Sequence, residues 1–453
     1  MFVPVAMRFR LALLLYALLG SGVGLAQTAP DFSAVDALMQ DSLDQIGGGA
    51  VVRVVRADTV VFERAYGAFG ADESVEIASA SKWLSGAVVM SLVDSGDLSL
   101  DDPLARYFPD LTGLKRTINI RQLFALTSGI TGSAGSTCIN EVSATLSACA
   151  DEILSRSLSH VPGQGFLYGG ASMHVAARAA EIATGRAWAD LFEERIAEPL
   201  GMTQTAYLSE TNPWVAGGLA SSAPDYTAFL QMVANKGMYK GKRVLSEASV
   251  AAMLEDQSGV ESGDVPVLFT PFSRYAGGDP DVPTAEVGYG VGVWREQLNA
   301  SGALRHASSP GAYGFSPWVD VEREVGGALA VLDDGPDVFW TYLELKRRIE
   351  AALDAVPTSG EPERQPPSTV EITGVRPNPL RRSGHVAFEL TEPSSVRLSL
   401  IDALGRESAV LAEGAFAVGR HAVAFTTRGL AAGTYLALLR AGDARSVQRV
   451  TVL

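Results

Sequence analysis

The spacing of apolar positions separates helical from strand segments along the chain. At residues 32–46 apolar side chains recur at helical spacing, and a run of three glycines follows. Two apolar runs, 50–55 and 59–64, lie on either side of the polar Arg56-Ala57-Asp58, which predicts a β-hairpin. The domain therefore begins with a helix followed by a hairpin.

A second helix is predicted from about Ser79. Apolar residues between Leu84 and Leu92 fall at helical spacing and predict an inward-facing stripe. The Asp-Ser-Gly sequence at 94–96 supplies a stop signal.

The middle third of the chain, about 100–285, is predicted to be helical and rich in loops, and strand patterns return after it. The strand-like runs are 289–295, 313–321 and 326–332, and a helix is predicted over 338–355. Strands at both ends with helices between them predict one sheet assembled from distant segments. Residues 258–285, with many glycines and prolines, are expected to form a loop that shapes a pocket.

Pro, Ser and Gly dominate residues 356–369, which predicts a linker. Beyond it, short alternating runs such as 396–400 and 435–439 are separated by glycine turns. This pattern predicts a small all-β sandwich. The expected organisation is a first domain at 27–355, the linker and a second domain at 370–453.

The chain of 453 residues carries a formal net charge of −15. This charge argues against nucleic acid or an anionic membrane as a partner. Residues 370–453 hold ten arginines and seven acidic residues, or +3, which leaves −18 for the rest. The shift in charge supports a separate C-terminal module.

The N-terminus has the pattern of an export signal. Arg8 and Arg10 precede an apolar run at 11–19, and Gly24-Leu25-Ala26 offers small residues for cleavage. We expect residues 1–26 to be a signal peptide, with an uncleaved anchor as the alternative. No later stretch is long and apolar enough to span a membrane. The mature protein is expected outside the cytoplasm.

The only two cysteines are Cys138 and Cys149. An oxidising compartment favours a disulfide between them, and two unpaired buried thiols are the alternative. The five histidines are scattered, without ligand spacing to each other or to the cysteines. We therefore expect no metal.

The sequence Ser79-Ala80-Ser81-Lys82 places a hydroxyl one helical turn from an amine. A desolvated lysine can be neutral enough to take a serine proton. The alternative is an ordinary helix start with Ser79 as its N-cap. Tyr168, just before a predicted helix at 171–184, is well placed for proton transfer, unless it is a packing aromatic. The stretch 306–312 offers a strand edge for an oxyanion, or a plain turn.

Together, several stretches resemble the serine β-lactamase and penicillin-binding protein superfamily. They are most similar to its class C-like branch, which includes D-aminopeptidases and carboxylesterases, and the resemblance covers about residues 30–355. The stretches are 77–82, 120–130, Pro162-Gly163 ahead of Tyr168, 198–205, 216–222 and 289–292. The resemblance implies an α/β (α+β) fold, with an antiparallel sheet flanked by helices and a helical subdomain.

The resemblance also implies roles for single residues. Ser79 would attack a carbonyl and form an acyl-enzyme, with Lys82 and Tyr168 sharing the proton transfers. The backbone N–H groups of Ser79 and Ala312 would form the oxyanion hole. A small-molecule or peptide substrate is implied, and no cofactor or metal is required.

Two departures from the family pattern affect the substrate. The second motif usually reads Tyr-x-Asn, but Gly170 stands at the third place. The third motif usually begins with a cation, but here it reads Ser309-Pro310-Gly311, with His306 three residues earlier. Gly170, His306, Ser309 and Gly311 are the expected substrate-binding positions. An ester or a different peptide becomes as plausible a substrate as a β-lactam, and efficient antibiotic hydrolysis is not expected.

The tail resembles the Ig-like C-terminal sorting domains of proteins exported by the type IX system of Bacteroidetes-like bacteria. The matching stretches are 375–379, 402–406, 419–421 and 433–435. This implies a secreted or cell-surface protein and the outer-membrane secretion machinery as partner. The alternative is a carbohydrate- or surface-binding sandwich kept in the mature protein.

The main hypothesis is an exported serine hydrolase. One rival is a penicillin-binding-like protein that acylates but turns over weakly or not at all. Another is a surface adhesin whose function lies in the tail. The sequence leaves the substrate and the oligomeric state open.

Overall fold

The computed structural model describes residues 30–355 and 370–452 with several gaps. The gaps are 133–137, 140, 142, 259–287, 300, 334–335, 377, 379, 381, 392, 402–406, 432 and 442–443. The predicted signal peptide, the linker at 356–369 and all of the expected pocket loop except Ser258 fall outside the described residues.

A seven-stranded antiparallel sheet is built from both ends of the first domain, which confirms the prediction of one sheet from distant segments. The N-terminal hairpin pairs with a strand almost 280 residues later, in the register Val51 to Ala330. The strand order is β2-β1-β12-β11-β10-β9-β8. The bounds are β1 Gly49–Arg56, β2 Thr59–Gly67, β8 Gly288–Tyr289, β9 Trp294–Leu298, β10 Leu304–Ser308, β11 Ser316–Asp320 and β12 Val325–Ala330.

Two details of this sheet differ from the prediction. The run predicted as one strand at 289–295 is split into β8 and β9 by a tight turn. A Cβ on Gly290 would lie 2.1 Å from the carbonyl oxygen of Met253, so this turn packs directly against the helical segment that contains Met253. Strand β10 was not predicted, because most of its side chains are polar or small.

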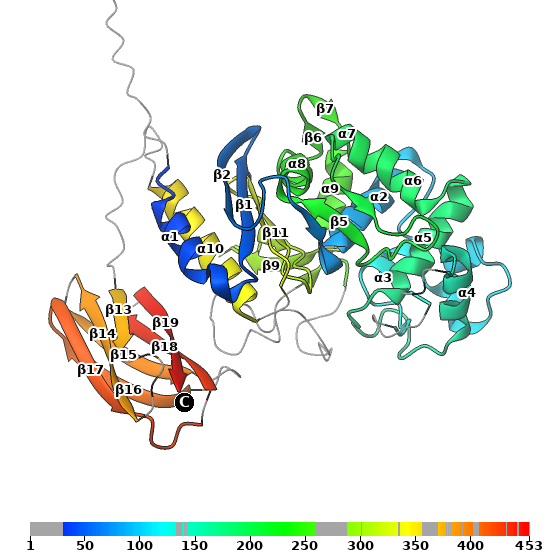
Figure 1. Cartoon of the computed structure of the whole chain (residues 1–453). Coiled ribbons are helices and arrows are strands. Elements are labelled where there is room, and N and C mark those ends of the chain that lie inside the picture. The colour runs from blue at the N-terminus through cyan, green and yellow to red at the C-terminus, as the bar shows by residue number, and fades with distance from the viewer. Residues whose placement is uncertain are drawn as a thin grey trace, which may run out of the picture.

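Helices cover both faces of the sheet (Figure 1). On one face, α1 and α10 pack side by side, and on the other face α8 packs against β1, β11 and β12. A helical region extends beyond α8. The bounds are α1 Ser33–Ser42, α2 Ser81–Ser95, α3 Ile120–Phe124, α4 Leu146–Ser155, α5 Ala171–Thr184, α6 Trp188–Phe192, α7 Glu198–Leu200, α8 Ala223–Ala234, α9 Glu247–Leu254 and α10 Pro336–Asp354.

Helix α2 is the central helix of the domain. The predicted stripe is buried, as expected, and the rest of the helix from Ser81 to Leu92 is buried too, so the helix is enclosed on all sides. Gly86 permits one close contact of this helix, because a Cβ there would lie 2.2 Å from the carbonyl oxygen of Val291. Within the described residues, no helix is long and apolar enough to cross a bilayer.

Small sheets complete the first domain. The sheet of β3 (Ser74–Glu76), β5 (Leu219–Ser222) and β4 (Ala206–Tyr207) lies next to the start of α2. The hairpin of β6 (Met238–Tyr239) and β7 (Lys242–Arg243) follows α8. Short 3-10 turns connect other elements, and they are η1 Leu43–Gln45, η2 Ala78–Ala80, η3 Leu104–Arg106 and η4 Gly113–Thr117, with a π-helical turn η5 at Glu193–Ala197.

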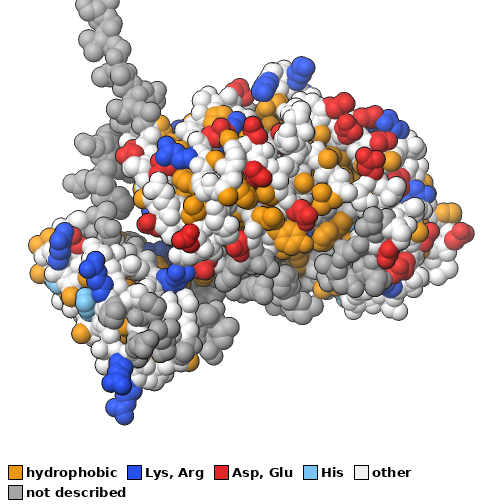
Figure 2. All heavy atoms as spheres, viewed as in Figure 1, with side chains coloured by type: hydrophobic (Ala, Val, Ile, Leu, Met, Phe, Trp, Pro, Cys, Tyr) orange, Lys and Arg blue, Asp and Glu red, His pale blue; other side chains and the backbone are white. Residues whose placement is uncertain are grey.

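The tail is built from strands, as predicted, in two sheets with a hydrophobic core of its own between them. The sheet orders are β13-β14-β17 and β16-β15-β18-β19. Lys and Arg side chains are visible on the tail, whereas Asp and Glu are frequent on the first domain (Figure 2). The bounds are β13 Val370–Arg376, β14 Ser383–Leu390, β15 Ser394–Ile401, β16 Glu407–Phe416, β17 Gly419–Thr426, β18 Gly433–Ala441 and β19 Ala444–Val452.

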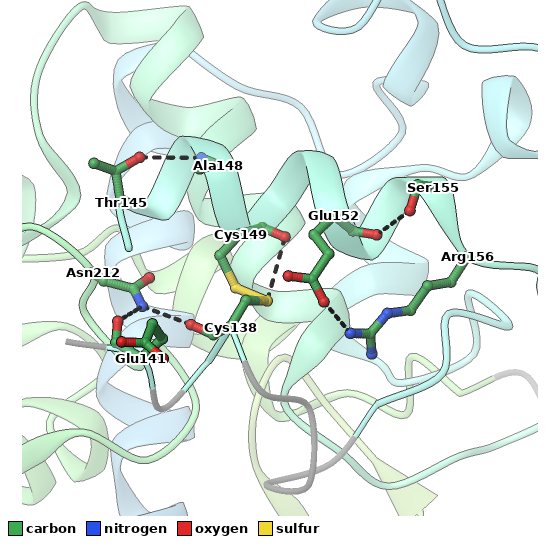
Figure 3. The surroundings of a disulfide bond; sticks show 9 residues. All are labelled: Cys138, Glu141, Thr145, Ala148, Cys149, Glu152, Ser155, Arg156 and Asn212. Carbon is green, nitrogen blue, oxygen red and sulfur yellow. Dashed lines mark hydrogen bonds and ion pairs between the residues drawn. A yellow bond between two sulfur atoms is a disulfide. The ribbon is translucent and has the colours of Figure 1, made fainter. Parts of the chain in front are cut away.

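Cys138 and Cys149 form a disulfide, which confirms the expected pairing (Figure 3). Cys149 lies on α4, and the helix begins after Thr145, whose side chain accepts a hydrogen bond from the N–H of Ala148. Asn212 joins this loop to the next segment, since its Nδ2 donates to the carbonyl oxygens of Cys138 (2.8 Å) and Glu141 (3.0 Å). The disulfide therefore fastens the loop ahead of α4 to that helix, and Asn212 ties the same loop to a later segment of the chain.

We predict that the variant Cys138→Ser/Cys149→Ser is less stable than the parent by about 2–3 kcal/mol, the cost expected for a closed loop of this length. The two cysteines are 11 residues apart, so the disulfide closes a short loop and lowers the conformational entropy of the unfolded chain only moderately. Equilibrium denaturation with and without a reductant measures the change. Equal midpoints for the oxidised parent and the variant would contradict a stabilising role.

Candidate active site

Ser79 lies in the 3-10 turn η2, immediately before α2. Ala78 has a positive φ of 42°, a strained conformation for a residue with a side chain, directly before the serine. The turn is tied to β5 by a hydrogen bond from the N–H of Ile77 to the carbonyl oxygen of Leu219. The N-cap of α2 is Ala80, so Ser79 does not cap that helix, and its hydroxyl is available for other contacts.

Lys82, in the first turn of α2, contacts Ser79 directly. Its Nζ lies 2.9 Å from Ser79 Oγ and 2.9 Å from the carbonyl oxygen of Ala216. The side chain is buried, and burial lowers the pKa of Lys82 to about 7. Both contacts are with uncharged oxygens, so they do not hold the amine in its charged form as a carboxylate would. Near neutral pH, a large share of the amine is therefore free to accept a proton.

Tyr168 completes the cluster around the serine. Burial raises the pKa of Tyr168 to about 12, although hydrogen bonds with the side chains of Ser79 and Trp294 act in the opposite direction. Its ring stacks on Trp294 at 5.1 Å between centroids, and Lys82 Nζ lies 4.7 Å from the centre of the ring. Tyr168 is thus in contact with the serine as a neutral phenol.

These two pKa values divide the proton-transfer roles between the amine and the phenol. A general base works best when its pKa lies near the operating pH. Lys82 meets that condition, whereas Tyr168 remains protonated across the physiological range. The geometry therefore favours Lys82 as the group that takes the serine proton and Tyr168 as a proton donor.

The third motif approaches Ser79 from the end of β10. Ser309 Oγ donates to the carbonyl oxygen of Ser79 at 3.1 Å. A Cβ on Gly311 would lie 2.1 Å from the carbonyl oxygen of Ile77, so only glycine allows this approach. Ala312 follows Gly311 directly, and the N–H of Ser79 lies in the first turn of a helix, where backbone donors lack intrahelical partners. The N–H groups of Ser79 and Ala312, which are the predicted oxyanion donors, therefore belong to two segments in direct contact.

Gly170 is the N-cap of α5, two residues after Tyr168. It is buried, and a Cβ there would lie 3.0 Å from Ala216 Cβ and 3.2 Å from Trp214 Nε1. The side chains of a different segment thus crowd the position where the family usually has asparagine.

His306 has its contacts on the side of the sheet that α10 covers. Its Nε2 lies 3.2 Å from Asp320 and 3.1 Å from Glu350, which is on α10. Arg305 and Arg323 also pair with these carboxylates. Ser309 instead contacts Ser79. The sequence predicted that His306 and Ser309 bind the substrate together, but the contacts of His306 are with carboxylates on the other side of the sheet.

Among the described residues, one group of side chains has ligand atoms close enough together to hold a metal ion, and it consists of His306, Asp320 and Glu350. Burial raises the pKa of Asp320, but its contacts with His306 and with the backbone and side chain of Arg323 outweigh burial and hold it well below the usual value. Because guanidinium groups already neutralise the carboxylates, the set is better described as an ion-pair network than as a metal site.

Sequence reasoning did not single out three residues that shape the site. Ala216 supplies the carbonyl for Lys82, Trp294 stacks on Tyr168, and Trp214 lies beside Gly170. Ala216 lies in the matching stretch 216–222, but it acts through its backbone carbonyl, so its side chain does not reveal the contact. The two tryptophans are distant in sequence from the motifs they contact.

Solved structures share this fold. One, from Bacteroides dorei DSM 17855 and described as a candidate β-lactamase, is 31% identical and superimposes with a TM-score of 0.63 over 72% of this chain and 99% of its own. The hydrolase EstCE1, described as having promiscuous acyltransferase activity, is 18% identical over 70% of this chain and 97% of its own, with a TM-score of 0.55, and supports the fold alone.

The family model described as "Beta-lactamase" matches residues 35–351, and the chain belongs to this family of serine hydrolases with the β-lactamase fold. Among curated relatives, penicillin-binding protein 4 of Amycolatopsis lactamdurans is 28% identical over 42% of this chain and 58% of its own length. Protein flp of Staphylococcus aureus (strain N315) is 27% identical over 36% of each chain. The chain thus spans less than two thirds of the length of each of these relatives.

We predict that kcat/KM for a neutral ester rises with pH and levels off above an inflection near pH 7. Only the neutral amine of Lys82 can accept the serine proton, and its share grows as the pH passes its pKa of about 7. Initial rates between pH 5 and 9 measure this profile.

Lys82→Arg is the control, because arginine keeps its charge throughout this range. Its rate should fall by about 10²- to 10⁴-fold and lose the inflection. An inflection above pH 9 in the parent would exclude Lys82 as the neutral base.

Proposed function

We propose that this protein is an exported serine hydrolase that cleaves an ester or amide through an acyl-serine intermediate at Ser79. The observation that carries the proposal is the 2.9 Å contact between Ser79 Oγ and the buried amine of Lys82. Family membership supports the same class of reaction.

The reaction begins when Ser79 Oγ attacks the substrate carbonyl carbon and its proton passes to Lys82 Nζ. Charge develops on the carbonyl oxygen, where the N–H groups of Ser79 and Ala312 would each be worth about 3 kcal/mol. As the tetrahedral intermediate collapses, the leaving group receives a proton from Tyr168, which Lys82 then restores. Water attacks the acyl-enzyme with the same groups in reverse order, and the acid is released.

An ester or a peptide unlike D-Ala-terminated substrates fits the site better than a penicillin. Ser309 stands where the family usually has a cation, and its hydroxyl donates to the Ser79 carbonyl. Gly170 offers no carboxamide. These features favour a substrate without a carboxylate next to the scissile bond.

We predict that purified protein hydrolyses p-nitrophenyl acetate and butyrate, and that Ser79→Ala abolishes turnover. Tyr168→Phe should lower kcat by about 10²- to 10⁴-fold, because it removes the proton donor and keeps the ring. Release of p-nitrophenol gives the rates, and intact mass after acid quenching reveals the acyl adduct. Turnover that survives Ser79→Ala would refute the assignment of the nucleophile.

A second candidate is a penicillin-binding-like protein that acylates and deacylates slowly. The altered positions favour it, since Gly170 lacks the carboxamide and Ser309 lacks the positive charge that the family usually has there. The same experiment distinguishes the two: a stoichiometric burst with a lasting adduct indicates the slow binder, and steady release indicates the hydrolase.

We further propose that residues 1–26 direct export and that residues 370–453 form a sorting domain, which would place the enzyme at the cell surface or outside the cell. The separate hydrophobic core of the tail supports an independent module. Deletion of residues 370–453 should leave ester turnover intact while abolishing surface delivery. A surface adhesin would instead lose its binding on this deletion, and an unchanged location would contradict the sorting role.

A further inference from the structure

The indole of Trp214 lies at the place left open by Gly170. A Cβ on Gly170 would meet Trp214 Nε1 at 3.2 Å and Ala216 Cβ at 3.0 Å, which is tighter than ordinary side-chain contacts. An asparagine at position 170 therefore requires Ala216 and Trp214 to shift by a few tenths of an ångström. A side chain at position 170 and the indole of Trp214 therefore crowd each other.

The backbone holds Trp214 firmly in this place. Its carbonyl oxygen accepts hydrogen bonds from the N–H groups of Gly217 (3.0 Å) and Gly218 (2.6 Å). A Cβ on Gly217 would lie 2.7 Å from the indole ring, so the ring packs directly on this turn. The next two residues contact α2, because Ser85 Oγ donates to the carbonyl of Val215 and Lys82 Nζ to that of Ala216. The indole is thus part of the same rigid segment that binds the catalytic amine.

The exposed part of Trp214 is hydrocarbon. The residue is partly exposed, but Nε1, its only polar side-chain atom, is buried. No group in the described part of the chain accepts a hydrogen bond from Nε1. Gly170 and Ala216 beside it are buried. A substrate group that reaches the indole beside Gly170 would therefore meet carbon atoms and no side-chain amide.

We propose that Trp214 determines acyl specificity: its indole replaces a carboxamide at position 170, and the site thereby selects plain aliphatic acyl groups over acylamino-substituted ones. This inference rests on the proposed acyl-serine mechanism and defines the substrate class of that site. An acylamino group buried against the indole would leave its amide without a partner, at a cost of about 1–3 kcal/mol, or roughly 5- to 150-fold in rate.

A pair of isosteric esters tests this selection. Phenyl pentanoate and phenyl N-acetylglycinate differ mainly in an amide that replaces two methylene groups, and both release phenol. The full-length enzyme should favour the pentanoate in kcat/KM, after correction for the uncatalysed rates, by at least about 5-fold. A preference for N-acetylglycinate in the parent would overturn the proposal.

Exchange of the two side chains should reverse this preference. Gly170→Asn alone should lower the melting temperature and the activity, because the new side chain clashes with the indole. Trp214→Ala/Gly170→Asn should recover stability relative to that single variant and shift the substrate ratio at least 10-fold toward N-acetylglycinate. Trp214→Phe retains an apolar ring and should keep the pentanoate preference.

Two further variants keep the test decisive. Trp340→Ala removes a partly buried tryptophan of α10 and should leave the ratio unchanged. If the double variant does not fold, Trp214→Ala alone still tests the proposal, since water admitted beside Gly170 can solvate the substrate amide and shift the ratio in the same direction. A ratio unchanged in a folded Trp214→Ala enzyme would refute the specificity role.

Intact mass separates this proposal from the underlying mechanism. Acyl adducts that depend on Ser79, together with a ratio insensitive to Trp214, would refute the specificity proposal and leave the hydrolase intact. Absence of any adduct on Ser79 in the parent, with no phenol released, would refute the hydrolase itself.

Discussion

The burial of Lys82 without a charged partner is the constraint on which the site depends. A buried amine loses hydration, and an ion pair usually compensates for this loss. Lys346 is also buried, and its Nζ lies 2.5 Å from a carboxylate oxygen of Glu296. Lys82 instead contacts a hydroxyl and a backbone carbonyl. The same side chain therefore forms an ion pair in one place and, in the proposed mechanism, serves as a base in the other.

Close backbone contacts make this burial possible. A Cβ on Gly292 would lie 2.2 Å from the carbonyl oxygen of Lys82, and one on Gly86 would lie equally close to that of Val291. Gly311 allows a comparable contact with Ile77 on the other side of Ser79. The glycines bring neighbouring segments directly onto the start of α2, which excludes water from the amine and sets the turn that carries the serine.

Much of this arrangement was predictable, because it follows from local patterns. The spacing of Ser79 and Lys82, the helix after Gly170 and the assembly of the sheet from both ends of the domain were all read from the sequence, and the structure has these elements in place. The two cysteines were also paired correctly. Each prediction needed only periodicity, spacing or cellular context.

The features that were missed depend on contacts between distant segments. Strand β10 was missed because most of its residues are polar or small. His306 was grouped with Ser309, but its ring contacts Asp320 and Glu350, whereas Ser309, just after the end of the strand, contacts Ser79. The contact between Gly170 and Trp214 joins positions 44 residues apart and has no local signature. A motif predicts which groups take part in a reaction, whereas the tertiary packing decides which side chains surround them.

Direct titration of the Lys82 side chain tests the central claim. The chain has six lysines, so labelling with lysine enriched in ¹³C at Cε gives few NMR signals, and the one lost in Lys82→Arg belongs to Lys82. We predict that this signal titrates near pH 7, because burial lowers the pKa of Lys82. Titration near the ordinary lysine value, about 10.4, would mean that the amine is charged at neutral pH and cannot be the base that activates Ser79.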